Sequence, residues 1–300
     1  DTACYPAKMV HGHIKWLVDH GAKWIFYPSI NYERIEDKTA PNHYNCPIVA
    51  TYPEVIAGNM DDIFEDNDVI FSHPFLPYDD DEKLERELYK LLRRTGVGRL
   101  EIEDAIKMAR AEDKRVRDDI KKQGEYSLKY ARDHKKKAVV LAGRPYHLDP
   151  EINHGIDTLI TSLGLGVITG DSIANEVVPK APLRVVNQWV YHARLYAAAD
   201  FVGHHDNLEL VQLNSFGCGV DAVTTDQVEE ILSSFDKMYT LIKIDEVNNL
   251  GAVRIRIRSL LASMNKREKD NIQARGDGDY TAKKKIFTKD MKDYTILIPQ

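Results

Sequence analysis

Residues 138 to 264 alternate between short apolar runs and amphipathic patterns of helical period, four times in succession. Strands are expected at 138–142, 167–169, 208–213 and 239–244. Apolar positions at helical spacing follow each strand, over 152–163, 184–199, 222–235 and 251–264. Strands that alternate with helices through short connections form a parallel sheet with helices on both faces. We therefore expect an α/β lobe with four parallel strands in this half.

One segment of this half fits two patterns. Residues 254–258 alternate with period two, which read alone indicates a strand. Over the longer window, Val253, Ile257, Leu260 and Leu261 lie at helical spacing after a glycine. We predict a helix, because a crossover must follow the fourth strand.

The first part of the chain is less regular. A helix over 7–20, a strand at 24–27, a short helix over 53–60 and a strand near 69–71 are expected. From 79 to 134 the apolar positions keep a 3.6-residue period, which indicates an amphipathic helical layer.

The whole pattern predicts an α/β protein of two Rossmann- or flavodoxin-like lobes with parallel sheets, linked by a helical segment. We expect an N-terminal lobe with the helical layer over 1–136 and a C-terminal lobe over 137–264. Residues 265–300 are highly charged at first and read as an exposed linker followed by the start of another element.

Both ends of the sequence resemble points inside a longer protein. It begins with Asp1 rather than Met, and residues 294–300 read as an opening strand. We expect the chain to be a fragment, with a β-α element of the N-terminal lobe ahead of residue 1.

Composition narrows the class of protein. The 300 residues include 41 basic and 47 acidic ones, a net charge of −6, without the basic face of a nucleic-acid binder. No apolar run reaches the roughly 18–20 residues of a membrane helix. Three cysteines are an odd number and too few for a disulfide scaffold, which favours a reducing, cytoplasmic location.

The three cysteines share an unusual local setting. Cys4, Cys46 and Cys218 each lie beside a proline or glycine turn and shortly before an expected helix. Helix N-termini lower the pKa of thiols and so favour metal ligation. The cysteines are either three unrelated buried thiols or three thiolates that converge on one inorganic centre.

For such a centre, three thiolates on an iron–sulfur cluster would leave one iron open to substrate or water. A zinc site with a histidine as fourth ligand is a further alternative. The sequence has no CxxC spacing that would decide between these sites.

Longer motifs surround the cysteines. They are residues 4–8 with 11–13, 42–47 with 52–55, 142–147, 214–219, and 244–246 with 251–256. Together they resemble a domain of the large CoA-substrate-specific enzyme activase proteins of anaerobic bacteria. That domain is itself similar to the subunits of 2-hydroxyacyl-CoA dehydratases and benzoyl-CoA reductases. The resemblance covers about residues 1–264.

The resemblance implies a 4Fe-4S cluster held by cysteines between the two lobes, with Cys4, Cys46 and Cys218 as its ligands. It implies low-potential electrons from an ATP-dependent activase module, in the same or a separate chain, for radical reduction or dehydration of an acyl-CoA. Members of the family often have a further cysteine where Ser29 stands, so four thiolates are not expected here. The rival interpretation is a non-catalytic docking or regulatory domain with no cluster or only a structural metal.

Six further residues in these motifs are candidates for a second layer around the cysteines. The two cations could offset an anionic cluster or bind a CoA phosphate, and the two histidines could support the cluster or bind substrate. The two carboxylates could be partners of the cysteines, although capping a helix is the simpler role for the second. No residue is assigned as catalytic. The six are Lys8, His11, Glu54, Arg144, His147 and Asp221.

Overall fold

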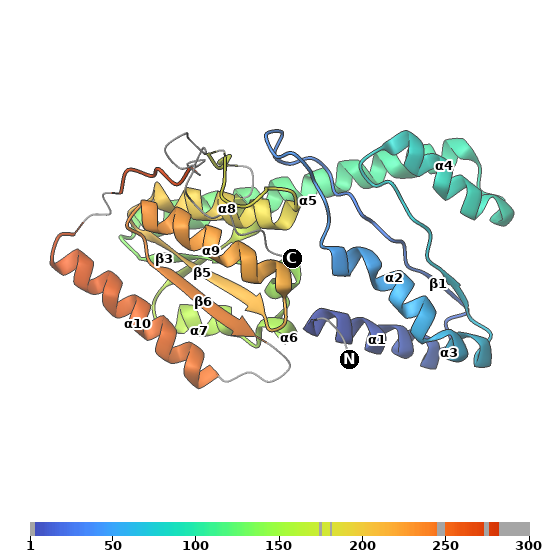
Figure 1. Ribbon diagram of the computed structural model, residues 1–300, viewed down its shortest axis with the longest axis horizontal. Coiled ribbons are helices and arrows are strands. Elements are labelled where there is room, and N and C mark those ends of the chain that lie inside the picture. Colours follow the sequence, from blue (N-terminus) through green and yellow to red (C-terminus); the bar gives the residue numbers. More distant parts are fainter. Residues whose placement is uncertain (1–3, 174–175, 181, 245–249, 273–275, 282–300) are drawn as a thin grey trace, which may run out of the picture.

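The structure is a computed structural model that describes residues 4–173, 176–180, 182–244, 250–272 and 276–281. In these residues the chain forms two lobes that a long helix connects (Figure 1). Helices make up 57% of the described residues, and the sheets that these residues form are parallel. The fold is therefore α/β and Rossmann-like, as the hydrophobic pattern predicted.

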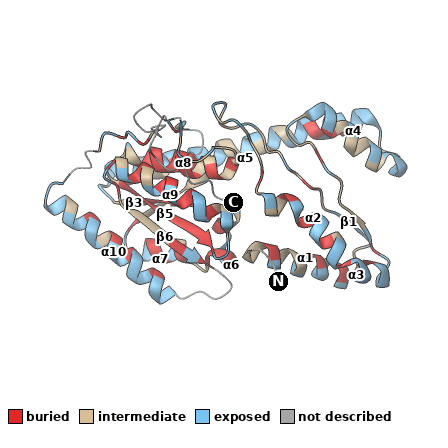
Figure 2. Cartoon of the chain, in the orientation of Figure 1, coloured by how far each residue is buried: buried red, intermediate tan, exposed pale blue. Residues whose placement is uncertain are grey.

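Four parallel strands form the sheet of the C-terminal lobe, in the order β4-β3-β5-β6. Every residue of β3 and β5 is buried (Figure 2), which explains why β3 is a continuous apolar run. The chain leaves β3 toward β4 and leaves β5 toward β6, in opposite directions along the sheet. The carboxyl ends of β3 and β5 therefore flank a topological switch point, where ligands bind in open parallel sheets. The bounds are Ala138–Ala142 for β3, Gly166–Thr169 for β4, Leu208–Ser215 for β5 and Tyr239–Ile244 for β6.

Helices cover both faces of this sheet. Val140 and Leu141 are neighbours in β3 and point to opposite faces. Val140 belongs to an apolar cluster with α8 and α9, and Leu141 to a cluster with α6, α7 and α10. The helices are α6 (Pro150–Asn153), α7 (Ile156–Ser162), α8 (Val190–Gly203), α9 (Gly219–Ser234) and α10 (Leu250–Lys269).

The N-terminal lobe has a smaller sheet, in which β1 pairs in parallel with β2. Three helices pack on it through a core that includes Ile14, Ile25 and Ile56. In Figure 1 the N-terminal ends of α1 and α2 point toward the C-terminal lobe. The elements are α1 (Tyr5–Asp19), β1 (Trp24–Phe26), α2 (Pro47–Asn59), α3 (Asp61–Asp66) and β2 (Ile70–Ser72).

The expected helical layer between the lobes is confirmed. It consists of α4 (Asp81–Leu92), the 3-10 turn Arg93–Thr95 and α5 (Arg99–Asp133). Ile102 and Ile106 near the start of α5 pack with α4, while Ala131 near its end joins the core of the C-terminal lobe. The 35 residues of α5 thus belong to both halves of the molecule.

A loop of the N-terminal lobe is attached to the C-terminal lobe. Tyr44 forms a bridge with Trp189, and its N–H and C=O bond to the backbone on either side of Trp189 at 2.8 and 3.1 Å. Arg194 of α8 donates two hydrogen bonds to the carboxylate of Glu36, at 2.8 and 2.5 Å. These contacts fix the loop that leads to Cys46.

Three helices differ from the sequence-based boundaries. α2 begins at Pro47 rather than residue 53, because proline at the first helical position is pre-organised for the helix. The helix expected over 152–163 is interrupted where His154 and Gly155 have φ of +55° and +78°. The helix expected from 184 begins only at Val190, after the extended segment that pairs with Tyr44.

The linker expected from residue 265 also starts later. α10 continues to Lys269, and Tyr280 is only 3% exposed because it packs on the C-terminal lobe and donates a hydrogen bond to Asp200. The strand expected at 294–300 lies outside the described residues.

Candidate functional site

Each of the three cysteines is the N-cap residue of a helix. Cys4 precedes α1, Cys46 precedes α2 and Cys218 precedes α9. Proline occurs at the first or second position of α1 and α2, and α9 begins with glycine, so the sequence itself starts the helices there. All three thiols are partly exposed and outside disulfides. The expected placement before helices is confirmed for each of them.

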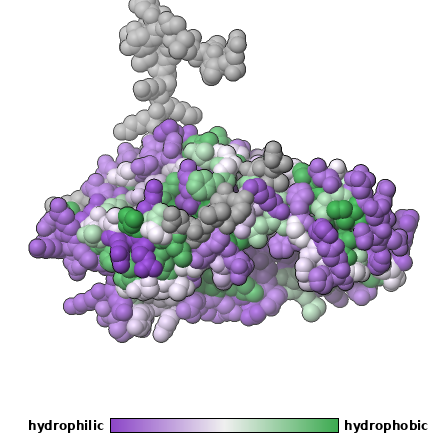
Figure 3. All heavy atoms as spheres, turned by 90° about the horizontal axis from the view of Figure 1, so that it is seen from below, coloured by the Kyte–Doolittle hydropathy of each residue, from purple (hydrophilic) through white to green (hydrophobic). Residues whose placement is uncertain are grey.

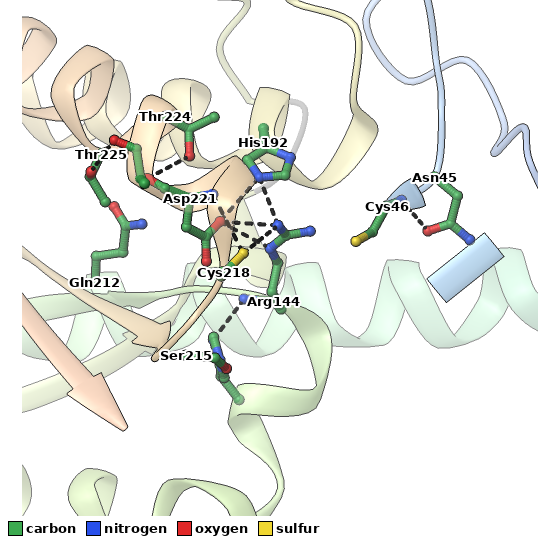
Figure 4. Close-up of polar contacts among 12 residues, drawn as sticks. Asn45, Cys46, Arg144, His192, Gln212, Ser215, Cys218, Asp221, Thr224 and Thr225 are labelled. Carbon is green, nitrogen blue, oxygen red and sulfur yellow. Dashed lines mark hydrogen bonds and ion pairs between the residues drawn. The ribbon is translucent and has the colours of Figure 1, made fainter. Parts of the chain in front are cut away.

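The two lobes bring these helix starts toward one another. Cys4 and Cys46 come from the N-terminal lobe, and Cys218 lies at the switch point of the C-terminal lobe. Figure 4 shows the Cys46 side chain pointing from its own lobe toward Arg144 and Cys218. Arg144 follows β3, and electrostatic interactions with both Cys46 and Cys218 reach its guanidinium.

Two tyrosines lie between the cysteines. The Tyr52 hydroxyl is 3.7 Å from the Sγ of Cys4 and also interacts electrostatically with Cys46 and Tyr146. Tyr146, from the turn after β3, interacts in the same way with Cys4 and Arg144. Burial raises the pKa of both hydroxyls, so both remain protonated near neutral pH. Residues of both lobes thus lie near the three cysteines.

A buried ion pair lies beside Cys218 in the C-terminal lobe. The guanidinium of Arg144 is 3.0 Å from Oδ1 of Asp221 and 2.7 Å from Nε2 of His192. All three side chains are at most 4% exposed. Burial favours the neutral acid, yet the contact with His192 and the charge of Arg144 lower the pKa of Asp221 to about 2. The site therefore keeps a fixed cation and a fixed anion side by side.

Cys218 is held at this ion pair. Its Sγ accepts hydrogen bonds from the backbone N–H of Asp221 at 3.4 Å and from Nη2 of Arg144 at 3.7 Å. Burial, with the nearby Asp221 carboxylate, nevertheless raises the pKa of the Cys218 thiol to about 11. The expectation that a helix start lowers this pKa is therefore wrong for Cys218 in the metal-free chain. Loss of solvent and a neighbouring anion outweigh the helix N-terminus there.

His147 supports the turn that carries Arg144. Its Nδ1 accepts a hydrogen bond from the backbone N–H of Arg144 at 3.0 Å, and its Nε2 is 3.2 Å from the hydroxyl of Ser215. Because Nδ1 accepts, the proton of the neutral ring is on Nε2, which donates to Ser215. Burial lowers the pKa of His147 to about 3. His147 thus connects the ends of β3 and β5 as a neutral side chain.

Two of the remaining candidates, Glu54 and His11, make their described side-chain hydrogen bonds to residues other than the cysteines. Glu54 bonds to His73 at 2.9 Å on the surface and is not a partner of Cys46. His11 bonds to the carbonyl of Ala7 within α1, and Lys8 is exposed on the same helix. Of the six, Arg144, His147 and Asp221 are brought together.

Three site residues were missed by sequence reasoning: His192, Tyr52 and Tyr146. The two tyrosines belong to quoted motifs, but His192 lies inside α8 and has no motif of its own. In the described structure its Nδ1 is buried and without a hydrogen-bond partner.

The described residues include no group of three or more His, Cys, Asp or Glu side chains arranged to hold a metal ion. The three thiols are therefore not arranged to hold a single metal ion together in the described part of the chain. Metal sites commonly form only as the metal binds, because the ligands must lose their protons first.

A cavity of about 420 Å³ lies at the amino ends of the strands, at the end of the sheet opposite to Arg144 and Cys218. Several lysine and arginine residues line it, including Lys136 and Arg267. The C-terminal ends of α5 and α10 lie there, and basic residues near helix C-termini are stabilising in themselves. Those helix ends disfavour an anion, so we place the candidate site at the cysteines. On the face shown in Figure 3, apolar patches are interrupted by polar side chains.

The family comparison agrees with the motifs. A family model described as "CoA enzyme activase uncharacterised domain" matches residues 1–173 of the 300. The chain belongs to this family. The matched part of this CoA enzyme activase domain contains Cys4, Cys46 and Arg144, and it ends before Cys218. No curated protein and no solved structure matched the chain. Among the described residues, no helix is long and apolar enough to cross a membrane.

Proposed function

We propose that this CoA enzyme activase domain binds an iron–sulfur cluster, of the 4Fe-4S type, through Cys4, Cys46 and Cys218. Its role would be to accept low-potential electrons from an ATP-dependent activase module for the radical reduction or dehydration of an acyl-CoA. The observation that carries the proposal is that the three cysteines, which come from both lobes, are each the N-cap residue of a helix, and that Arg144 interacts electrostatically with Cys46 and Cys218.

The side chains near the three cysteines suit an iron–sulfur cluster. Thiolates are the usual ligands of iron–sulfur clusters, and three of them leave one iron with an open position. The buried guanidinium of Arg144 interacts electrostatically with Cys46 and Cys218, so it can offset the negative charge of bound thiolates. A cluster is larger than a single ion, so thiols that are too far apart for one ion can still be its ligands.

When bound, the cluster would supply one-electron chemistry at low potential. The residues of this chain would hold the cluster between the lobes, stabilise the charge of its thiolates and limit the access of water to it. Arg144 and Asp221 would fix the charges beside Cys218, and the protonated hydroxyls of Tyr52 and Tyr146 would present neutral donors.

A non-catalytic docking or regulatory domain is the second candidate. The raised pKa of Cys218 favours it, since a thiol that keeps its proton is not a ligand, and so does the finding that the described residues hold no three such side chains arranged for a metal ion. On this alternative the lobes serve to join an activase module to another protein.

Anaerobic purification followed by iron and acid-labile sulfide analysis separates the two candidates. The proposal expects iron and sulfide in comparable amounts, a visible absorption band, and their loss in each of the variants Cys4→Ser, Cys46→Ser and Cys218→Ser. The exposed substitution His13→Asn on α1 is the matched control and should retain both elements. A chain that takes up neither iron nor sulfide during anaerobic reconstitution would overturn the proposal and leave the docking role.

A further inference from the structure

Each lobe places a side chain that can donate a hydrogen bond beside the sulfur of its own cysteine. In the N-terminal lobe, the hydroxyl of Tyr52 in α2 is 3.7 Å from the Sγ of Cys4. In the C-terminal lobe, Nη2 of Arg144 is 3.7 Å from the Sγ of Cys218. The two contacts join residues 48 and 74 positions apart in sequence, so they depend on the tertiary fold.

The Tyr52 contact has a defined direction once Cys4 binds a metal. A ligating cysteine is a thiolate and has no proton to donate, so the hydroxyl must be the donor. Tyr52 itself is 8% exposed, so its hydroxyl is held within the fold beside this sulfur.

Asp221 holds the guanidinium of Arg144 in position beside Cys218. Nε and Nη2 of Arg144 lie 3.3 and 3.0 Å from the same carboxylate oxygen of Asp221, so the guanidinium cannot rotate freely. The backbone N–H of Asp221 adds a second donor to the Cys218 sulfur. Cys46 differs, since no hydrogen bond to its sulfur occurs among the described residues.

We propose that Tyr52 and Arg144 are positioning residues that raise the reduction potential of the cluster by hydrogen bonding to the sulfurs of Cys4 and Cys218. This inference rests on the proposed cluster function. Reduction adds negative charge that spreads onto the ligand sulfurs, and a donor aimed at a sulfur stabilises that charge. Because the donors come from different lobes, the potential depends on both lobes being in place.

The test is a potentiometric titration of the anaerobically reconstituted chain, followed by electron paramagnetic resonance. Wild type is compared with Tyr52→Phe, which removes only the donating hydroxyl and conserves the volume of the ring. Tyr146→Phe is the matched control, since its hydroxyl is also near Cys4 but is hydrogen-bonded to Ser215, and no hydrogen bond joins it to a sulfur among the described residues. Iron content is measured for every variant, so that equal loading is established first.

We expect the midpoint potential of Tyr52→Phe to be more negative than that of wild type, by more than any shift in Tyr146→Phe. An equal or smaller shift overturns the role of Tyr52. Arg144→Lys keeps the positive charge, but one ammonium cannot serve Asp221 and the sulfur with the geometry of a guanidinium. Its midpoint should also become more negative, and an unchanged midpoint overturns the role of Arg144. A wild-type chain that forms no cluster overturns the proposed function together with this inference, whereas a cluster with unchanged midpoints overturns the inference alone.

Discussion

Replacing His147 with asparagine should remove a large part of the acid sensitivity of the fold. His147 is 1% exposed and binds the backbone N–H of Arg144 through Nδ1, a contact that requires a neutral ring. An asparagine oxygen can accept the same hydrogen bond but does not titrate. The variant therefore separates the charge of the ring from its structural role.

The magnitude follows from the pKa of His147. Burial, assisted by the charge of Arg144, lowers it from 6.5 to about 3, while Asp221 acts in the opposite direction. Because the folded pKa is below the unfolded one, the unfolded chain binds the proton more readily. The stabilisation is complete above the unfolded pKa and is lost as the pH falls from 6.5 toward 3. Each pH unit in this window costs up to about 1.4 kcal/mol, which gives about 2.5 kcal/mol between about pH 7.5 and about pH 4.5.

Urea unfolding of the metal-free chain at these two pH values measures the effect. Wild type should lose about 2.5 kcal/mol more stability on acidification than His147→Asn. Any constant cost of the smaller side chain cancels, because it is present at both pH values. His13→Asn, an exposed change on α1, should lose as much stability as wild type. Equal losses in wild type and His147→Asn would refute the conclusion that burial keeps this ring neutral.

Three further changes test the geometry around the site. Gly143→Ala should destabilise the chain by about 2 kcal/mol, because its Cβ would lie 2.5 Å from Nδ1 of His147, and this appears as a lower midpoint in thermal unfolding. Gly12 lies within α1, and an added Cβ would meet no other atom there. Gly12→Ala should therefore stabilise the helix by roughly 1 kcal/mol and raise the midpoint of thermal unfolding. Arg194→Met removes the two hydrogen bonds that hold Glu36 to α8, so limited proteolysis should cut the loop before Cys46 faster than in wild type. An unchanged rate of cleavage would show that these bonds do not fix the loop.

The parallel strands of the C-terminal lobe could be predicted from the sequence because burial on both faces leaves a plain apolar signal. The bounds of β3 and β6 are the predicted ones. The segment at 254–258 also resolved as predicted: Val253, Ile257 and Leu260 are buried along one face of α10, so the longer helical window outweighed local alternation.

Helix starts were harder to predict where tertiary contacts decide them. Residues 184–189 contain apolar side chains at helical spacing, but the chain there is irregular, with bends at Arg184 and Val185 and extended backbone at Trp189. Trp189 forms a bridge with Tyr44, and Arg184 donates its backbone N–H to the side chain of Gln227 at 2.7 Å. Both partners are far away in sequence, so no local pattern contains this information.

In the candidate site, too, features that neighbouring residues determine could be predicted from the sequence, whereas features that depend on tertiary packing could not. The helix starts at the cysteines could be predicted, because the adjacent proline and glycine residues determine them locally. Glu54, in contrast, is eight residues after Cys46 in the sequence and belongs to another surface of α2, where it meets His73. His192 reaches the site only because α8 packs beside α9, which brings it 3.1 Å from Asp221.

Cys46 belongs to the N-terminal lobe, but contacts with the C-terminal lobe fix the loop that leads to it. The backbone of Tyr44, two residues earlier, is bonded on both sides of Trp189, and α8 begins at the next residue. α8 also carries His192, which contacts Arg144 and Asp221 beside Cys218. One helix therefore sets the position of Cys46 and of the ion pair at Cys218 together. Cys4 is positioned by side-chain packing instead, because Tyr5 and Met9 at the start of α1 pack against the apolar cluster of the C-terminal lobe that includes Leu141.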